Sequence, residues 1–102
     1  MDRVLSMIGL ATKAGKVVSG EFSVEKSIKS GRAFLVVIAE EASENTRKKF
    51  TNSCEFYNVP LRFYGDKQSL GKANGKMTRT SISIQDEGFA KQIIAAISDV
   101  AE

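Results

Sequence analysis

The chain has 102 residues, 42% of them apolar and 26% charged, which is the size and composition of a single folded domain spanning residues 1–102. With one cysteine and no histidine, the sequence excludes an intramolecular disulfide and a histidine-dependent catalytic triad. Residues 1–85 carry 14 basic against 8 acidic residues, whereas residues 86–102 carry one lysine against four acidic residues, so the basic body of the domain suits a polyanionic partner.

The longest apolar run, residues 33–39, is too short to span a bilayer, and the N-terminal residues form no signal-peptide core. A metal ion would have only carboxylates beside one thiol, and the sequence contains neither a Walker phosphate loop nor a dinucleotide-binding glycine fingerprint. We therefore expect a cytoplasmic monomer that makes no membrane contact, holds no metal or cofactor and is not an enzyme.

Nine alternating elements are predicted along the chain. In order, they are a helix at residues 2–14, a strand at 16–19, a helix at 20–30, a strand at 33–39, a helix at 43–57, a strand at 59–64, a helix at 66–74, a strand at 79–84 and a helix at 86–101. The helices follow from apolar residues at helical spacing and from capping residues, among them Ser19-Gly20 before the second helix. This alternation predicts an α/β fold, a three-layer α/β/α sandwich.

Several side chains have a predicted environment. The unbroken apolar run 33–39 indicates a central strand covered on both faces, whereas in the last strand only Ile82 and Ile84 need to face inward. Cys54 lies in phase with Phe50 and Tyr57, so we expect it to pack in the core rather than to react. The apolar stripe of the last helix could dock on its own sheet or on a partner, and we expect it to dock on its own sheet.

Two acidic residues follow the central strand, where open α/β sheets often bind ligands. Glu40 and Glu41 could in principle act as acid and base. Adjacent residues do not normally converge on one substrate, so we interpret them as part of a solvated turn.

The start of the second helix is the first candidate site. A helix N-terminus offers unpaired N–H donors and a positive dipole, which suit phosphates. Glu21 there could accept hydrogen bonds from a guanine edge while nearby cations hold the backbone. These cations are Lys13, Lys16, Lys26, Lys29 and Arg32. Alternatively, Glu21 only complements the helix dipole and the lysines are solvated.

The loop of residues 75–79 is the second candidate. It combines two cations with a flexible apolar side chain, a pairing able to meet a phosphate and an unstacked base together. The alternative is an ordinary turn. If this loop and the helix start lie at one end of the sheet, they form a joint site.

The sequence also resembles a known family. The motifs that carry the resemblance are V-V-S-G-E before the second helix, A-F-L-V-V-I-A-E-E-A-S-E-N-T in the centre, C-E-F-Y-N-V-P-L, and S-L-G-K-A-N-G. Over roughly Asp2 to Ile97, the chain is similar to the kink-turn RNA-binding ribosomal protein superfamily of the L-seven-Ae and L-thirty-e type, which includes small bacterial homologues of the YlxQ type.

The resemblance implies an L-thirty-e-like α/β/α sandwich with a small mixed four-stranded sheet. It also implies binding of RNA kink-turns, whose tandem sheared G·A pairs are read by the start of the second helix and whose bend is covered by a loop near the last strand. Gly20 stands where many members have asparagine, and Val24 stands where they have lysine, with Lys26 two positions on.

The sequence therefore predicts noncatalytic binding of structured RNA, a kink-turn, by a ribosomal or ribosome-associated protein. The expected RNA-binding residues are Lys16, Ser19, Gly20, Glu21, Lys26, Gly75, Lys76, Met77, Thr78 and Arg79. The alternative is a protein–protein interaction module on the same fold, which an exposed apolar patch on the last helix would favour.

Overall fold

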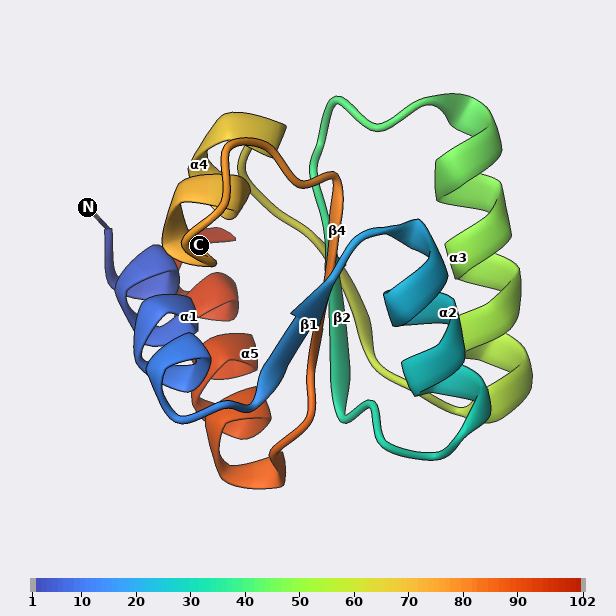
Figure 1. The fold of residues 1–102 in the computed structure, drawn as a ribbon, viewed down its shortest axis with the longest axis horizontal. Coiled ribbons are helices and arrows are strands. Elements are labelled where there is room, and N and C mark those ends of the chain that lie inside the picture. The colour runs from blue at the N-terminus through green and yellow to red at the C-terminus, as the bar shows by residue number, and fades with distance from the viewer. Residues whose placement is uncertain (1, 102) are drawn as a thin grey trace.

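A computed structural model describes residues 2–101 of the chain, and side chains as far as residue 100. Its elements are α1 (Arg3–Lys13), β1 (Val17–Ser19), α2 (Glu21–Lys29), β2 (Leu35–Ile38), α3 (Glu44–Tyr57), β3 (Leu61–Phe63), α4 (Lys67–Ala73), β4 (Ser81–Ile84) and α5 (Glu87–Ala101). All nine predicted elements are present (Figure 1). Each strand is one to three residues shorter than predicted, because the predicted segments include end residues that lie outside the registers of paired residues.

Polar caps fix where the helices begin. Asp2 caps α1 by accepting a hydrogen bond from the Leu5 N–H at 2.8 Å. Ser43 caps α3, and Asp66 with Ser69 forms a reciprocal capping box at α4. Each cap satisfies an N–H group that has no partner inside its helix, which typically stabilises a helix by about 1 kcal/mol.

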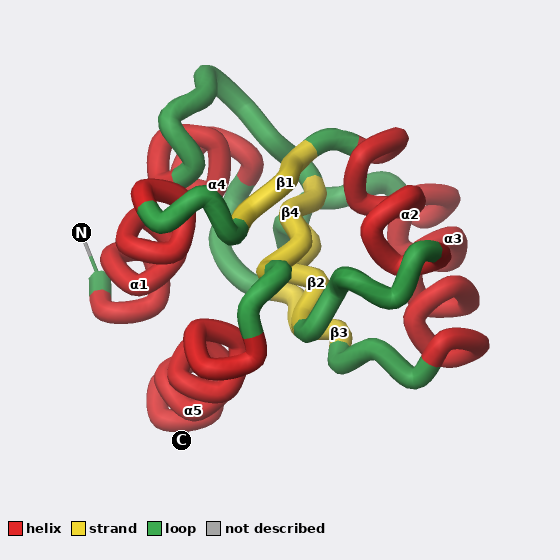
Figure 2. The backbone as a smooth tube through the Cα atoms, turned by 60° about the horizontal axis from the view of Figure 1, so that its bottom comes forward, coloured by secondary structure: helices red, strands yellow, loops and turns green. Residues whose placement is uncertain are grey.

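The sheet is mixed, with the strand order β1-β4-β2-β3. β2 and β3 are parallel, and β4 runs antiparallel to both β1 and β2. In Figure 2 the strands follow one another in this order, with α1, α4 and α5 on one side and α2 and α3 on the other. The expected three-layer sandwich with a small mixed sheet is confirmed.

Two apolar clusters hold the layers together, and β2 contributes to both. Its alternating side chains send Leu35 and Val37 to the α1, α4 and α5 side and Val36 and Ile38 to the α2 and α3 side. All four are fully buried, as predicted for the central apolar run. The apolar stripe of α5 packs on its own sheet, where Ile93 and Ile97 are buried; the side chain of Ala101 lies outside the described residues.

The prediction that only the isoleucines of β4 face inward was wrong, because Ser81 and Ser83 are buried as well. β4 lies between β1 and β2 and has helices over both faces. The hydroxyl groups of Ser83 and Ser27 of α2 are hydrogen-bonded at 2.8 Å, and the Gln85 amide donates to the Ser27 hydroxyl at 2.9 Å. This polar network satisfies the buried hydroxyls and ties α2 to the middle of the sheet.

On α3, the prediction of a shared buried face holds for two of three residues. Phe50 and Cys54 are buried, but Tyr57 at the end of the helix is 42% exposed. The chain turns there through Asn58, which has left-handed backbone angles, and the Tyr57 ring packs edge-on against Phe56. No helix within residues 2–101 has the length and hydropathy needed to cross a membrane.

The buried position of Cys54 leads to a test of its reactivity. Burial and the nearby Glu25 carboxylate raise the pKa of the Cys54 thiol to about 11. Because the thiolate is the reactive form, we expect iodoacetamide to alkylate the folded protein at pH 8 roughly 100-fold more slowly than the same chain in urea, where the thiol pKa is near its ordinary value. Mass spectrometry over time measures both rates, and equal rates would contradict a buried, protonated thiol.

Candidate nucleic-acid interface

The two candidate segments, the start of α2 and the loop of residues 75–79, are neighbours at one edge of the sheet, where β1 ends and β4 begins. There the Gly20 N–H donates to the Ser81 carbonyl at 3.0 Å. α2 starts at this edge, and the loop between α4 and β4 passes over it, at the upper end of the sheet in Figure 1. The condition for a joint site is therefore met.

Arg79 links the loop to the end of β1. Its Nε donates to the Ser19 hydroxyl at 2.9 Å, and its Nη1 donates to the Thr78 carbonyl at 2.7 Å. A shallow hollow of about 250 Å³ lies beside this contact, between Glu21 at the start of α2 and Thr78 and Arg79 of the loop. The guanidinium is thereby held at the rim of a polar recess.

Thr46 in the first turn of α3 also lines this hollow, and the sequence analysis missed it. The available signal was its position after the central strand, because the carboxyl ends of strands in α/β sheets often carry ligand-binding groups. The same signal pointed to Glu40 and Glu41, which lie closer to the strand. Nothing local in the sequence indicates that α3 begins beside α2.

The start of α2 has an uncapped backbone. Its N-cap is Gly20, one of the two residues predicted to cap the helix, but Gly20 has no side-chain acceptor and no side chain caps the first turn. The Ser19 hydroxyl instead accepts from Arg79. The first N–H groups of α2 are thus open to an external acceptor, and the helix dipole favours an anion there.

Glu21 is exposed at the start of α2. Its carboxylate lies 3.6 Å from the Lys49 Nζ of α3, and its side chain is 59% exposed. An ion pair in such exposed surroundings contributes little to stability. Glu21 can therefore leave Lys49 and accept hydrogen bonds from another group at small energetic cost.

The loop of residues 75–79 is held by the backbone of α4. The Lys76 N–H donates to the Gly71 carbonyl at 2.7 Å, and the Arg79 N–H donates to the Lys67 carbonyl at 2.9 Å. A Cβ on Gly71 would lie 2.6 Å from the Thr78 Cα, so the loop can rest on α4 only because Gly71 has no side chain. The Met77 side chain is 91% exposed above this support.

Two of the expected RNA-binding lysines lie apart from this edge. Lys16 precedes β1, and its carbonyl accepts from the Gln85 N–H at the opposite end of the sheet, roughly 10 Å from Ser19 at 3.3 Å per strand residue. Lys26 is exposed on the side of α2. Val24, which the resemblance set against a family lysine, is fully buried, so its side chain cannot reach a ligand.

The acidic residues after β2 belong to a turn. Glu41 accepts from the Lys67 N–H at 2.6 Å, and the Glu40 N–H donates to the Gly65 carbonyl at 2.8 Å. These contacts fix the start of α4 and match the interpretation as a solvated turn. Among the described residues, no three potential metal-ligating side chains come together.

The profile of the ribosomal protein L7Ae/L30e/S12e/Gadd45 family matches residues 2–94. The chain belongs to this family. It is 43% identical over 91 residues to the RNA-binding protein YlxQ of Bacillus subtilis, and the matched segment covers 89% of this chain and 91% of that protein. It is also 32% identical over 102 residues to the large ribosomal subunit protein eL8 of Thermoplasma volcanium, covering 99% of this chain and 84% of that protein.

A solved structure of a Bacillus halodurans protein superposes with a TM-score of 0.93 at 35% identity, covering 96% of this chain and 99% of that one. The 15.5kD RNA binding protein of Giardia lamblia has a TM-score of 0.81 at 24% identity, covering 94% and 85%, and shares the fold. Both the family resemblance and the fold expected from the sequence are confirmed.

Gly20 offers a test of the backbone conformation at the start of α2 in this member of the L7Ae/L30e family. Its φ of 94° and ψ of 151° fall in a region that is essentially restricted to glycine, where another residue costs about 1–3 kcal/mol. We expect Gly20→Asn to lower the free energy of unfolding by that amount. Gly15→Asn is the matched control, because Gly15 has a φ of 73° nearer the left-handed range that asparagine tolerates; equal losses in urea denaturation would contradict the assignment.

Gly71 tests the support of the loop. We expect Gly71→Ala to lower the free energy of unfolding by about 1–3 kcal/mol, because the new methyl group must displace the Thr78 backbone. In α1, a Cβ on Gly9 would lie 3.7 Å from its nearest neighbour, the Ala73 carbonyl oxygen, so Gly9→Ala should stabilise the helix by up to about 1 kcal/mol. Urea denaturation of both variants measures the difference, and an unchanged midpoint for Gly71→Ala would show that the loop does not need this close approach.

Proposed function

We propose that this protein binds structured RNA without catalysis, and that the RNA is a kink-turn bound by the start of α2 and the loop of residues 75–79. The observation that carries the proposal is the uncapped N-terminus of α2 beside Glu21 and Arg79 at one edge of the sheet. Relatives named as an RNA-binding protein and as a large ribosomal subunit protein support an RNA partner.

The chemistry of this edge suits RNA more than a small anion alone. The backbone N–H groups of α2 can donate to phosphate or base oxygens, while the Glu21 carboxylate can accept from base amino and imino groups. A site with both kinds of partner reads a base edge next to a phosphate backbone. The exposed Met77 provides an apolar cover for an unstacked base.

The proposal extends to the setting of the complex. Ribosomal or ribosome-associated RNA is the partner we propose, which places the protein in the cytoplasm, where it would act as a monomer on one RNA site. A protein-interaction role on the same fold has less support, since the apolar face of α5 packs against α1 and the sheet.

Base reading by Glu21 is tested with a kink-turn RNA and a variant whose G·A pairs are disrupted. We expect Glu21→Ala to weaken binding of the intact RNA by about 1–3 kcal/mol, the value of one good base contact, and to change binding of the disrupted RNA little. Glu44→Ala is the matched control, because Glu44 is likewise an exposed glutamate in the first turn of a helix. If Glu21→Ala weakens both RNAs equally, the carboxylate does not read a base.

Lys26 tests the phosphate contribution. We expect Lys26→Ala to weaken binding of both RNAs to a similar extent and to reduce the slope of log K against log salt concentration by about one, because one fewer phosphate is neutralised. Titrations at several salt concentrations measure this slope. A loss confined to the intact RNA would assign Lys26 to base recognition instead.

A further inference from the structure

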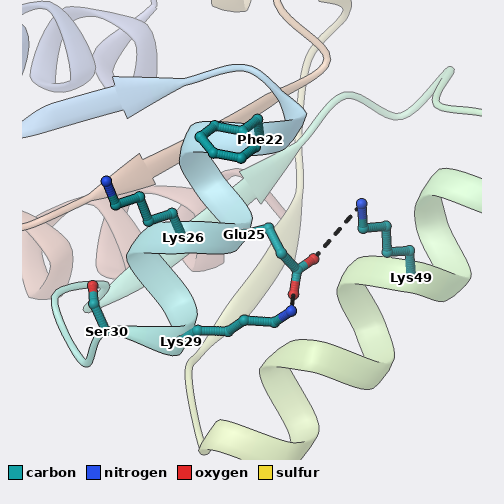
Figure 3. Close-up of a pocket in the computed structure, with 6 residues that line it drawn as sticks. All are labelled: Phe22, Glu25, Lys26, Lys29, Ser30 and Lys49. Carbon is teal, nitrogen blue, oxygen red and sulfur yellow. Dashed lines mark ion pairs between the residues drawn. The ribbon is translucent and has the colours of Figure 1, made fainter.

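An aromatic side chain stands exposed on α2 beyond the candidate interface. Phe22 is 80% exposed, although an aromatic ring in water gains nothing for the stability of the isolated protein. Lys26 lies one turn further along α2 and extends away from α3, whereas Glu25 points toward α3 (Figure 3). Phe22 and Lys26 thus mark a face of α2 that no other element within residues 2–101 covers.

Hollows flank Phe22 on both sides, and of the two only the hollow toward α3 is lined by a carboxylate. In the hollow toward α3, the ammonium groups of Lys29 and Lys49 lie 3.9 and 4.0 Å from the Glu25 carboxylate. Glu25 also accepts from the Ser53 hydroxyl at 2.7 Å. Glu25 pairs with two of the three lysines of this hollow, the third being Lys26. Its half-buried carboxylate would repel a phosphate, so this hollow is the poorer phosphate site.

The hollow on the other side of Phe22, toward β1, has a volume of about 390 Å³. Its cations are Lys26 and Arg32, and neither forms an ion pair with any residue among 2–101. Its lining, all within the described part of the chain, includes the hydroxyls of Ser23 and Ser30 and no carboxylate. An aromatic face, two free cations and hydroxyl groups therefore surround one recess.

We propose that this recess binds one unpaired nucleotide that flanks the RNA helix, with its base stacked on Phe22 and its phosphates beside Lys26 and Arg32. Base stacking on an exposed aromatic ring with nearby cations is the usual mode of binding single-stranded nucleic acid. Phe22 directly follows Glu21, so a strand leaving the start of α2 reaches the ring without crossing another element. The inference rests on the proposed RNA-binding function and extends the interface along α2.

The test compares a blunt kink-turn RNA with two longer RNAs, each carrying six unpaired uridines at one of the two ends. We expect one extended RNA to bind the wild-type chain about tenfold more tightly than the blunt RNA, as one stacked base provides. Phe22→Leu keeps an apolar side chain but has no aromatic face, so it should remove this advantage and leave the affinity for the blunt RNA unchanged. Phe56→Leu, at an aromatic that is 79% exposed on α3, is the matched control and should change neither affinity.

A second readout reports the stacking itself. The chain contains no tryptophan and two tyrosines, so Phe22→Trp introduces a single tryptophan at the proposed site that can be excited apart from the tyrosines. The extended RNA should quench its emission more than the blunt RNA does. Phe56→Trp should respond to neither RNA. Arg32→Ala should lower the salt dependence of binding by about one unit for the extended RNA alone.

The outcomes separate this inference from the proposed function. Three results would overturn the nucleotide site, even while selective binding of the intact kink-turn stands. The extended RNA could keep its higher affinity in Phe22→Leu, Phe22→Leu could weaken the extended and blunt RNAs equally, or the wild-type chain could bind both RNAs with equal affinity. Binding of the uridine extension that depends on Phe22, without selectivity for the G·A pairs, would support the nucleotide site and reject the kink-turn. Equal quenching of both tryptophan variants would also overturn it, because it would indicate nonspecific contact.

Discussion

The antiparallel pairing of β1 with β4 is the contact on which the candidate interface depends. It sets Ser19 opposite Ile82 and brings the Gly20 N–H to the Ser81 carbonyl. A slip of one residue would turn the buried side chains of β4 to the opposite face of the sheet. The apolar clusters therefore fix this register, and with it the positions of the start of α2 and the end of the loop.

The packing of α2 determines which of its groups can meet a ligand. Val24 and Ile28 are fully buried, and Ser27 is bonded to Ser83 in the middle of the sheet, so the helix cannot rotate about its axis. One flank faces α3, where lysines and glutamates pair with each other. The remaining flank faces solvent and carries Lys26, with Arg32 just beyond the end of the helix, and neither forms an ion pair within residues 2–101. Charge therefore favours an anionic partner on that flank.

Local signals predicted much of this architecture, and long-range pairing accounts for what they missed. Helical spacing and caps such as Asp66 act within a few residues, so element order and the two candidate segments could be read from the chain. Periodicity reports which face a side chain occupies but not which strand lies beside it. The strand order and the helix arrangement, which no local pattern encodes, explain three features. Ser83 is buried, Lys16 lies far from the candidate interface, and Thr46 lines the hollow at that interface.

Gly20 and Arg79 act together to keep the start of α2 open. A serine before a helix normally accepts a hydrogen bond from the first turn, and forgoing such a cap costs about 1 kcal/mol. Here Arg79 donates to the Ser19 hydroxyl, while the backbone angles of Gly20 disfavour a residue whose side chain could cap the helix instead. The unused N–H groups are the means of recognition, because a donor already satisfied inside the protein has little to gain from a ligand. Arg79 can hold Ser19 only while its loop rests on α4, so the availability of the helix donors depends on the close approach at Gly71.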